Sequence, residues 1–430
     1  MQQFINPSFD EWNILTERPT ASYEDLEPLV AEVFEAVKKE GDQAVRKYTA
    51  QFDKVALEEV RVGAQAINNA EKLVPEALKA AIQQAKVNIE SFHKAQDYKM
   101  QQLETQKGVV CWQEKKPIEK VGLYIPGGSA PLFSTILMLA IPAQIAGCKE
   151  IILCTPPTQE GTVPPVVLYT AQLCGVEKIY TIGGIQAIAA MALGTATIPK
   201  VYKIFGPGNQ YVTVAKQWAT RYQVSIDMPA GPSELLVAAD ATANPAFIAA
   251  DLLSQAEHGP DSQVLFVTTH RPFLSEVTAA LEEQLNALPR KEIVAQALKN
   301  SKAFYFETNQ QAIDFINAYG PEHYIVCVEN EALYLEQVRN AGSVFVGNFT
   351  PESAGDYASG TNHTLPTNGY AKHYSGVNLD SFRKAITFQK ISKEGIQLLG
   401  NTIELMAEAE GLHAHKNAVR IRLNSLENEI

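Results

Sequence analysis

Apolar residues recur every three or four positions through the first quarter of the chain. One stripe runs from Leu26 to Val37, and a second runs from Leu78 to Phe92. This spacing puts apolar side chains on one face of a helix. We therefore predict amphipathic helices from Tyr23 to about Gln96, whose stripes belong to the core.

After Pro117 the pattern changes to short apolar strands, each ended by glycine or proline and followed by a helical segment. The strands read VGLYI, EIILC, KIYTI and YKIF, and ELLVAAD closes the series near Asp240. Alternation of strand and helix predicts a parallel, Rossmann-like sheet from about 121 to 235. A second series, QVLFVTT, AFYFE, HYIVCV and SVFVG, predicts a second α/β domain.

These patterns predict an α/β protein with two Rossmann-like parallel-sheet domains, one inserted in the other. We assign the early helices to the second series of strands, because they have no sheet of their own nearby. The predicted regions are an N-terminal arm (1–22), a discontinuous α/β domain (23–120 plus 236–377), a second Rossmann-like domain (121–235) and a helical C-terminal dimerisation tail (378–430).

Bulk composition narrows the possible functions. Lys plus Arg number 36 and Asp plus Glu number 48, and the net charge of −12 repels phosphate backbones and anionic lipid heads. Nucleic acid and membrane partners are therefore not expected. The N-terminus lacks a leader pattern and no stretch approaches the ~20 apolar residues of a membrane span, so we expect a cytoplasmic protein. The five cysteines form no CxxC pair, which predicts reduced thiols.

Gln255 and His258 are three residues apart in LLSQAEHGPDSQ. On a helical turn both side chains leave the same face, as two ligands of one metal ion must. The same residues also fit a polar helix end that stops at Gly259.

Glu322 and His323 follow a Gly-Pro turn and open a predicted strand. Histidine has an unperturbed pKa near ~6.5, so it can accept an alcohol proton at neutral pH. A surface turn without function explains the spacing equally well.

The segment PESAGDYASGTNHTLPTNG is too polar for a core and too long for a simple turn. It contains Glu352, Asp356 and His363. Polar loops of this kind often carry function, although a flexible surface loop has the same composition.

Glu410 and His415 lie on either side of Gly411, which we expect to end the helical stripe that runs from Ile396 to Met406. On one continuous helix residues five apart point about 140° apart, so only a break at Gly411 could direct both to one site. Without a break they form a solvated helix end.

Glycine turns follow three strands of the first series: YIPGGSAP, GGIQA and GPGN. Free backbone N–H groups at the helix starts that follow would suit a dinucleotide pyrophosphate. None of the turns is GxGxxG, however, and an ordinary strand-to-helix turn also needs glycine.

Several segments are more specific together than alone, because they occur in one order: YIPGGSAPLFST, KIFGPGN, DMPAGPSE, LLSQAEHGPDSQ, GPEH, SAGDYASGTNH and AHKNAV. In this order they resemble the histidinol dehydrogenase family over essentially the whole chain. The resemblance implies an NAD-dependent, zinc-requiring oxidation of L-histidinol through L-histidinal to L-histidine. It also implies a homodimer whose subunits share each active site.

The resemblance further implies roles for individual residues. His323 takes the alcohol proton, and Glu322 activates the water that attacks the aldehyde. Ser233, His363 and Glu410 contact the substrate alongside the metal ligands and this catalytic pair. One Zn²⁺ per subunit is bound by Gln255, His258, Asp356 and His415, and NAD is contacted by Tyr124, Gln186 and Asn209. Mn²⁺ or Co²⁺ could also fill such a nitrogen and oxygen site.

Two other functions fit parts of the same pattern. A zinc hydrolase would use the same ligands, with Glu322 beside a metal-activated water, and would turn over without NAD. A non-catalytic nucleotide or metal sensor would bind ligands without producing NADH, but it gives Glu322 and His323 no role.

Overall fold

The computed structural model describes residues 1–19, 24–98, 100–127, 131–229 and 231–428. These residues form two compact units. The first unit consists of Met1–Gln96 and Ile118–Phe382, and the second consists of Asp97–Pro117 and Arg383–Ile430.

A six-stranded parallel sheet, here called sheet A, runs in the order β1-β11-β10-β9-β12-β13. Its central strands are buried at every position, as expected for parallel strands covered on both faces. The strands are β1 (Gln2–Ile5), β9 (Glu234–Ala239), β10 (Gln263–Thr268), β11 (Lys302–Tyr305), β12 (His323–Cys327) and β13 (Ser343–Val346).

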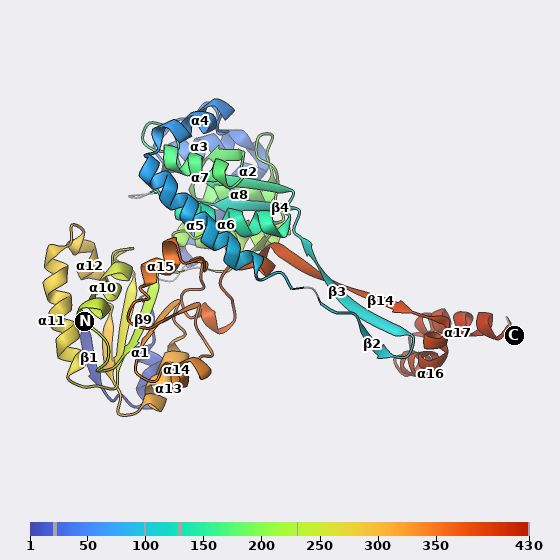
Figure 1. Cartoon of the computed structure of the whole chain (residues 1–430). Coiled ribbons are helices and arrows are strands. Elements are labelled where there is room, and N and C mark those ends of the chain that lie inside the picture. Colours follow the sequence, from blue (N-terminus) through green and yellow to red (C-terminus); the bar gives the residue numbers. More distant parts are fainter. Residues whose placement is uncertain (20–23, 99, 128–130, 230, 429–430) are drawn as a thin grey trace. The chain divides into compact units, whose positions relative to one another are not determined.

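Helices cover both faces of sheet A (Figure 1). One face carries α10 (Pro245–Ala256), α11 (Phe273–Ala287) and α12 (Lys291–Ala297). The other carries α1 (Trp12–Leu15), α13 (Asn309–Tyr319) and α14 (Glu331–Glu336).

A five-stranded parallel sheet, here called sheet B, runs in the order β6-β5-β4-β7-β8. Its strands are β4 (Lys120–Tyr124), β5 (Glu150–Thr155), β6 (Lys178–Thr181), β7 (Lys203–Phe205) and β8 (Ser225–Ile226). One face packs against α4 (Ala64–Ala70), α5 (Glu76–Lys94), α6 (Ser134–Ala146) and α7 (Pro165–Leu173). The other packs against α2 (Glu27–Glu40), α3 (Asp42–Phe52), α8 (Gly184–Leu193) and α9 (Gln210–Ala219).

The early helices therefore correct one prediction. Helices α2 to α5 cover sheet B, and not the second series of strands. Their apolar stripes predict that each helix has a core face, but a stripe does not specify which sheet it will cover. The inserted part of the fold consequently begins before residue 121.

Strand β9 corrects a second expectation. The sequence pattern places ELLVAAD at the close of the inserted sheet, whereas β9 pairs with β10 and β12 in sheet A. The short strand β8 closes sheet B instead. Because β1 and β9 to β13 flank sheet B along the chain, the prediction that one α/β domain is inserted in the other is confirmed.

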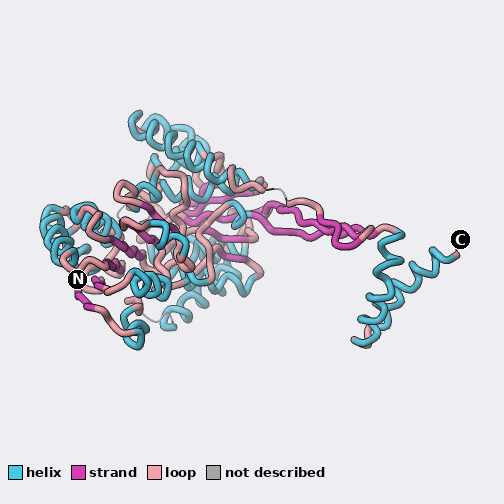
Figure 2. The backbone as a smooth tube through the Cα atoms, turned by 60° about the horizontal axis from the view of Figure 1, so that its bottom comes forward, coloured by secondary structure: helices cyan, strands magenta, loops and turns pink. Residues whose placement is uncertain are grey.

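The second unit contains an antiparallel sheet that the sequence analysis missed. Strand β3 (Val109–Pro117) pairs with β2 (Leu103–Gln106) and with β14 (Arg383–Ile391), and the long β3–β14 pair is visible in Figure 2. The tail is therefore not wholly helical from residue 378, and this unit also takes in residues that were assigned to the first domain. Both long strands are rich in polar residues, so apolar periodicity did not reveal them.

Two helices follow β14: α16 (Lys393–Ala409) and α17 (His413–Glu427), packed side by side. Gly411 lies between them with φ at +72°, a conformation that favours glycine. The predicted break at Gly411 is confirmed. In the described part of the chain, the helices are too short or too polar to cross a membrane. The five cysteines carry free thiols, as predicted.

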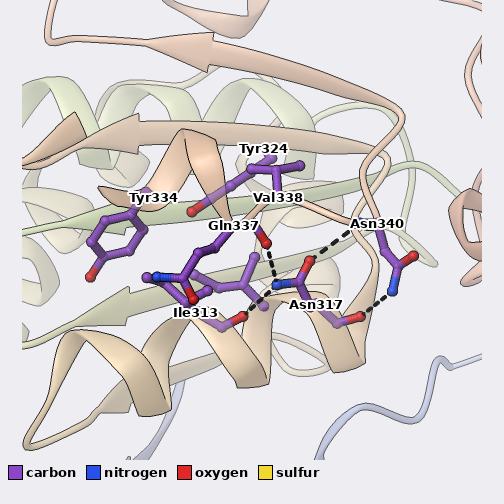
Figure 3. A pocket seen from close by; sticks show the side chains of 8 residues that line it. Ile313, Asn317, Tyr324, Tyr334, Gln337, Val338 and Asn340 are labelled. Carbon is purple, nitrogen blue, oxygen red and sulfur yellow. Dashed lines mark hydrogen bonds between the residues drawn. The ribbon is translucent and has the colours of Figure 1, made fainter. Parts of the chain in front are cut away.

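Asn317 on α13 fixes the segment that leads into β13 (Figure 3). Its Nδ2 donates to the carbonyl oxygens of Ile313 (3.1 Å) and Gln337 (2.9 Å). Its Oδ1 accepts from the backbone N–H groups of Arg339 (2.8 Å) and Asn340 (3.2 Å). One buried amide thus satisfies backbone groups of a turn that has no regular ladder of its own.

Asn317→Leu should lower the free energy of unfolding by about 2–4 kcal/mol, because it leaves several buried backbone groups without partners. Urea denaturation monitored by circular dichroism would measure the change. The control is Gln310→Ala on the exposed face of the same helix, which should change stability by no more than ~0.5 kcal/mol. Equal effects of the two substitutions would contradict the assigned role.

Candidate active site

One pocket of about 790 Å³ is lined by residues of both parallel sheets. The segments after β4 and β7 contribute Gly127, Gly206 and Asn209. The starts of β9 and β12 contribute Ser233 and His323. The volume lies within the range of small-molecule and cofactor sites.

The two sheets present opposite ends to this pocket. Strands β4 and β7 are neighbours at the point where the strand order of sheet B reverses, and ligands of open α/β sheets bind outside the carboxyl ends at such a point. Apart from its extra edge strand β1, sheet A repeats the same relative order, but it contributes the amino ends of β9 and β12. Sheet B therefore offers a nucleotide-type crevice and sheet A offers the titratable side chains.

The peptide of Glu234 orients the predicted catalytic pair. Its N–H donates to Oε2 of Glu322 (2.8 Å), and its carbonyl oxygen lies 3.1 Å from Nδ1 of His323. Because a carbonyl oxygen only accepts, Nδ1 of His323 carries a hydrogen. Nε2 is left as the atom that exchanges a proton with a ligand.

Carboxylates surround His323 on several sides. Burial lowers the pKa of His323, but the negative charges of Glu322, Glu352 and Asp356 together outweigh burial and raise this pKa well above its ordinary value. The carboxylate oxygens lie 3.6 Å, 4.0 Å and 3.4 Å respectively from the imidazole nitrogens. The carboxylates thus favour a proton on His323, and a cation that balanced their charge would favour the free Nε2 that can accept a proton.

Helix α15 (Glu352–Tyr357) supplies two of these carboxylates from one face, because Glu352 and Asp356 are four residues apart. Burial raises the pKa of Glu352 to about 8. Burial also acts to raise the pKa of Asp356, but the close interaction with His323 outweighs burial and lowers that pKa.

The donor atoms fit a divalent cation. Ligand atoms of His258, Glu352 and Asp356 all lie within 4.8 Å of one another. Oδ1 of Asp356 and Nε2 of His323 are buried 3.4 Å apart, and neither makes a hydrogen bond of regular geometry with a residue that the structure describes. Nitrogen and carboxylate donors without thiolate suit Zn²⁺ and related ions.

Gln255, in the last turn of α10, contacts this cluster through Glu352. It is fully buried, and the neighbouring groups assign its amide so that the nitrogen donates to the Glu352 carboxylate. The amide oxygen then accepts from the N–H of Glu234 at 3.2 Å. His258 follows α10 in a turn, and its N–H donates to the carbonyl oxygen of Gln255 (3.2 Å).

Two predicted substrate contacts lie at the same pocket. Oγ of Ser233 is 3.5 Å from Nδ1 of His258. Nδ1 of His363 donates to the carbonyl oxygen of Asp356 (2.8 Å), and its Nε2 lies 3.1 Å from the hydroxyl of Thr135. Burial lowers the pKa of His363, which favours the neutral imidazole.

The three predicted NAD residues lie at the carboxyl end of sheet B, but only one lines the pocket. Asn209 lines it and caps α9 by accepting from the N–H of Val212 (3.2 Å). Tyr124 and Gln186 are buried away from the described lining. The Tyr124 hydroxyl accepts from the N–H of Gly184 (3.1 Å), and Gln186 donates to Asp53 (3.0 Å).

A buried ion pair shapes the turn before Asn209. Asp227 accepts from the N–H of Gly206 (2.8 Å), and Lys216, paired with Asp227, donates to the Gly206 carbonyl oxygen (2.8 Å). Gly206 has φ at +131°, and a Cβ there would lie 2.0 Å from the carbonyl oxygen of Tyr124. Only glycine fits this turn.

Glu410 and His415 belong to the second unit. Glu410 caps the end of α16, His415 lies in the first turn of α17, and both are exposed. They flank the confirmed break at Gly411.

The sequence analysis placed Glu352 in a candidate functional loop but gave it no role, and it missed Glu234 and Arg18 as parts of this site. The spacing of four between Glu352 and Asp356 was a usable signal for Glu352. Glu234 is a charged residue opening a strand that is otherwise apolar, and such a residue needs a buried partner. Nothing in the local sequence identifies Arg18 as that partner.

Fold and site together define an α/β enzyme with a nucleotide-type crevice next to a buried histidine that carboxylates surround. The sequence profile of the histidinol dehydrogenase family matches residues 16–423. Histidinol dehydrogenases of Bacteroides thetaiotaomicron and Vibrio parahaemolyticus are 57% and 51% identical, over 98% and 97% of both chains. The crystal structure of histidinol dehydrogenase from Elizabethkingia anophelis matches with a TM-score of 0.98 and 58% identity, covering 99% of each chain.

The chain therefore belongs to the histidinol dehydrogenase family. It is an oxidoreductase of histidine biosynthesis, which decides against the hydrolase and the sensor.

Asp356→Asn should weaken Zn²⁺ binding to metal-stripped protein by at least about tenfold to a hundredfold, since loss of even an outer partner of a metal site has that effect. Competition with a chromophoric chelator would measure the affinity. Asp314→Asn is the matched control, because Asp314 is an exposed partner of Arg339. Wild-type affinity in Asp356→Asn would contradict the metal assignment.

Proposed function

We propose that the chain oxidises L-histidinol through L-histidinal to L-histidine with NAD and one Zn²⁺ per subunit. The observation that carries the proposal is a single pocket lined by both parallel sheets. The turn after β7 lies on one side of it, and Glu322 and His323 line it as well. Family membership supports the choice of substrate, because the relatives carry histidinol dehydrogenase as their name.

Gln255, His258, Asp356 and His415 would hold the zinc ion, and Tyr124, Gln186 and Asn209 would contact NAD. When bound, the ion orients the imidazole and amine of the substrate, and NAD accepts the hydrides. Glu352 is a further oxygen donor at the cluster, either to the ion or to the Gln255 amide.

His323 begins the reaction by accepting the hydroxyl proton at Nε2 while the carbon loses a hydride. Its Nδ1 stays bonded to the Glu234 carbonyl, so the ring keeps its orientation during the transfer. Glu322 then takes a proton from the water that adds to the aldehyde. A base removes a proton from the hydrate as the second hydride leaves.

The balance is one alcohol and one water consumed with two NAD, giving one carboxylate, two NADH and three protons. Ser233 and His363 contact the substrate from the first unit, and Glu410 meets its cationic amine. The burial of Glu322, His323 and Glu352 limits the access of bulk water to these side chains.

Glu410 and His415 would act in a homodimer, each completing the site of the other subunit. The break at Gly411 supports this role, because it lets two residues five apart converge.

Limiting L-histidinol with excess NAD should give about two NADH per substrate, because two hydrides leave one carbon. Absorbance followed to completion measures this ratio. A chelator should abolish the reaction, and Zn²⁺ should restore it. A ratio of one would mean that Glu322 lacks its assigned role, and no NADH from zinc-loaded protein would overturn the proposal.

Hybrid dimers test the shared site. His323→Gln and His415→Ala should each be nearly inactive, because they remove the base and a metal ligand. Random exchange of subunits between them should restore about a quarter of wild-type activity, because half of the dimers then hold one intact site. Two His323→Gln preparations mixed in the same way are the control. Continued inactivity of mixtures in which native mass spectrometry detects hybrids would show that each site is built within one subunit.

A further inference from the structure

We infer that Arg18 and Glu234 are a positioning pair that holds Glu322 and His323 in reacting orientation. The inference rests on the proposed function, and it extends the catalytic apparatus to the segment that follows α1. Neither residue reaches the reacting atoms; both act through the peptide of Glu234.

The pair is buried and geometrically fixed. Nε and Nη2 of Arg18 donate to the two carboxylate oxygens of Glu234, each at 3.0 Å. The side chains are 10% and 2% exposed. This bidentate arrangement fixes distance and angle together, which a single contact does not.

Tyr319 holds the guanidinium from a second direction. Nη2 of Arg18 also donates to the Tyr319 carbonyl oxygen (2.8 Å), and the guanidinium carbon lies 3.8 Å from the centre of the Tyr319 ring. The guanidinium is therefore anchored to the end of α13 as well as to Glu234.

The peptide of Glu234 links this pair to the chemistry. Its N–H and carbonyl bind Glu322 (2.8 Å) and His323 (3.1 Å). On this side of β9, strand pairing with β12 begins only at Leu235, opposite His323. On the side that faces β12, the Glu234 peptide therefore bonds to the side chains of Glu322 and His323. The Glu234 carboxylate, held by Arg18, is the restraint nearest to these two bonds.

A third segment ends on the same carboxylate. Oε1 of Glu234 accepts from the N–H of Asn368 (2.6 Å), which follows His363 by five residues. One carboxylate therefore connects the segment after α1, the start of β9 and the loop that carries a substrate contact.

Stability alone does not account for the pair. Replacing a buried ion pair by apolar residues is often neutral or stabilising, whereas removal of one partner leaves a costly buried charge. A role in orienting Glu322 and His323 explains why the ion pair lies directly behind them. Small displacements of reacting groups have large effects on rate.

The first test uses Arg18→Ala and Arg18→Lys, which removes the fork but keeps the charge. We expect kcat for NADH formation to fall about a hundredfold in Arg18→Ala, as for a misplaced reacting group, and less in Arg18→Lys, with KM for NAD and zinc content unchanged. Methylguanidinium should restore part of the activity of Arg18→Ala. Arg339→Ala, which removes an exposed arginine paired with Asp314, is the control and should keep wild-type kcat.

A double-mutant cycle separates positioning from general damage to the fold. In a His323→Gln background, Arg18→Ala should cost less than about threefold, because the group it positions is already gone. A full hundredfold loss in that background would overturn the inference. If Arg18→Ala fails to fold, Arg18→Lys takes its place, and wild-type kcat in Arg18→Lys would also overturn it.

The last readout does not depend on the activity. In protein labelled with ¹⁵N-histidine, the Nδ1 proton of His323 gives a signal that is absent from His323→Gln. Arg18→Lys should broaden this signal or speed its exchange with water, because the Glu234 carbonyl is less firmly held. An unchanged signal overturns the inference whatever the wild type does with histidinol, whereas a changed signal without NADH formation would fault the proposed function alone.

Discussion

The arrangement of the site depends on the two hydrogen bonds that the Glu234 peptide makes. Its N–H and carbonyl bind Glu322 and His323, and its carboxylate binds Arg18. The side chain and the peptide of one residue thus connect a buried ion pair to the proposed catalytic pair. Because Glu234 opens a strand that is buried at every position, its peptide ties Glu322 and His323 to the centre of sheet A.

The two sheets explain why this arrangement lies next to a cofactor crevice. Both have the same relative strand order, apart from the extra edge strand β1 of sheet A, yet sheet B presents its carboxyl ends and sheet A its amino ends. In sheet B the crevice at the reversal of strand order has the backbone of the Gly206 turn, fixed by Lys216 and Asp227. Sheet B can therefore bind a dinucleotide while sheet A supplies groups for proton transfer. Both functions use strand ends, so the buried centres of the sheets stay apolar.

Periodicity and turn residues were enough to predict the parallel sheets, the insertion and the break at Gly411. They could not predict which sheet the early helices cover, because a stripe identifies a face and not its partner. Apolar periodicity did not predict strand β14, because its polar residues face solvent on a narrow antiparallel sheet. In the site, motif order located Glu322 and His323, but Arg18 reaches Glu234 across 216 residues, and no local pattern carries that information.

The charge around His323 supports the proposal that the cluster binds a cation. Three carboxylates near one imidazole repel one another, and burial strengthens the repulsion. A proton on His323 and a proton on Glu352, whose pKa burial raises to about 8, relieve the repulsion only in part. The buried Oδ1 of Asp356 still makes no hydrogen bond of regular geometry with a described residue. A divalent cation would account for both the clustered negative charge and the unpaired oxygen. It would neutralise the carboxylates, and Oδ1 of Asp356 would be free to coordinate it. Burying these carboxylates together costs free energy, and a site that binds a cation explains why the fold accepts that cost.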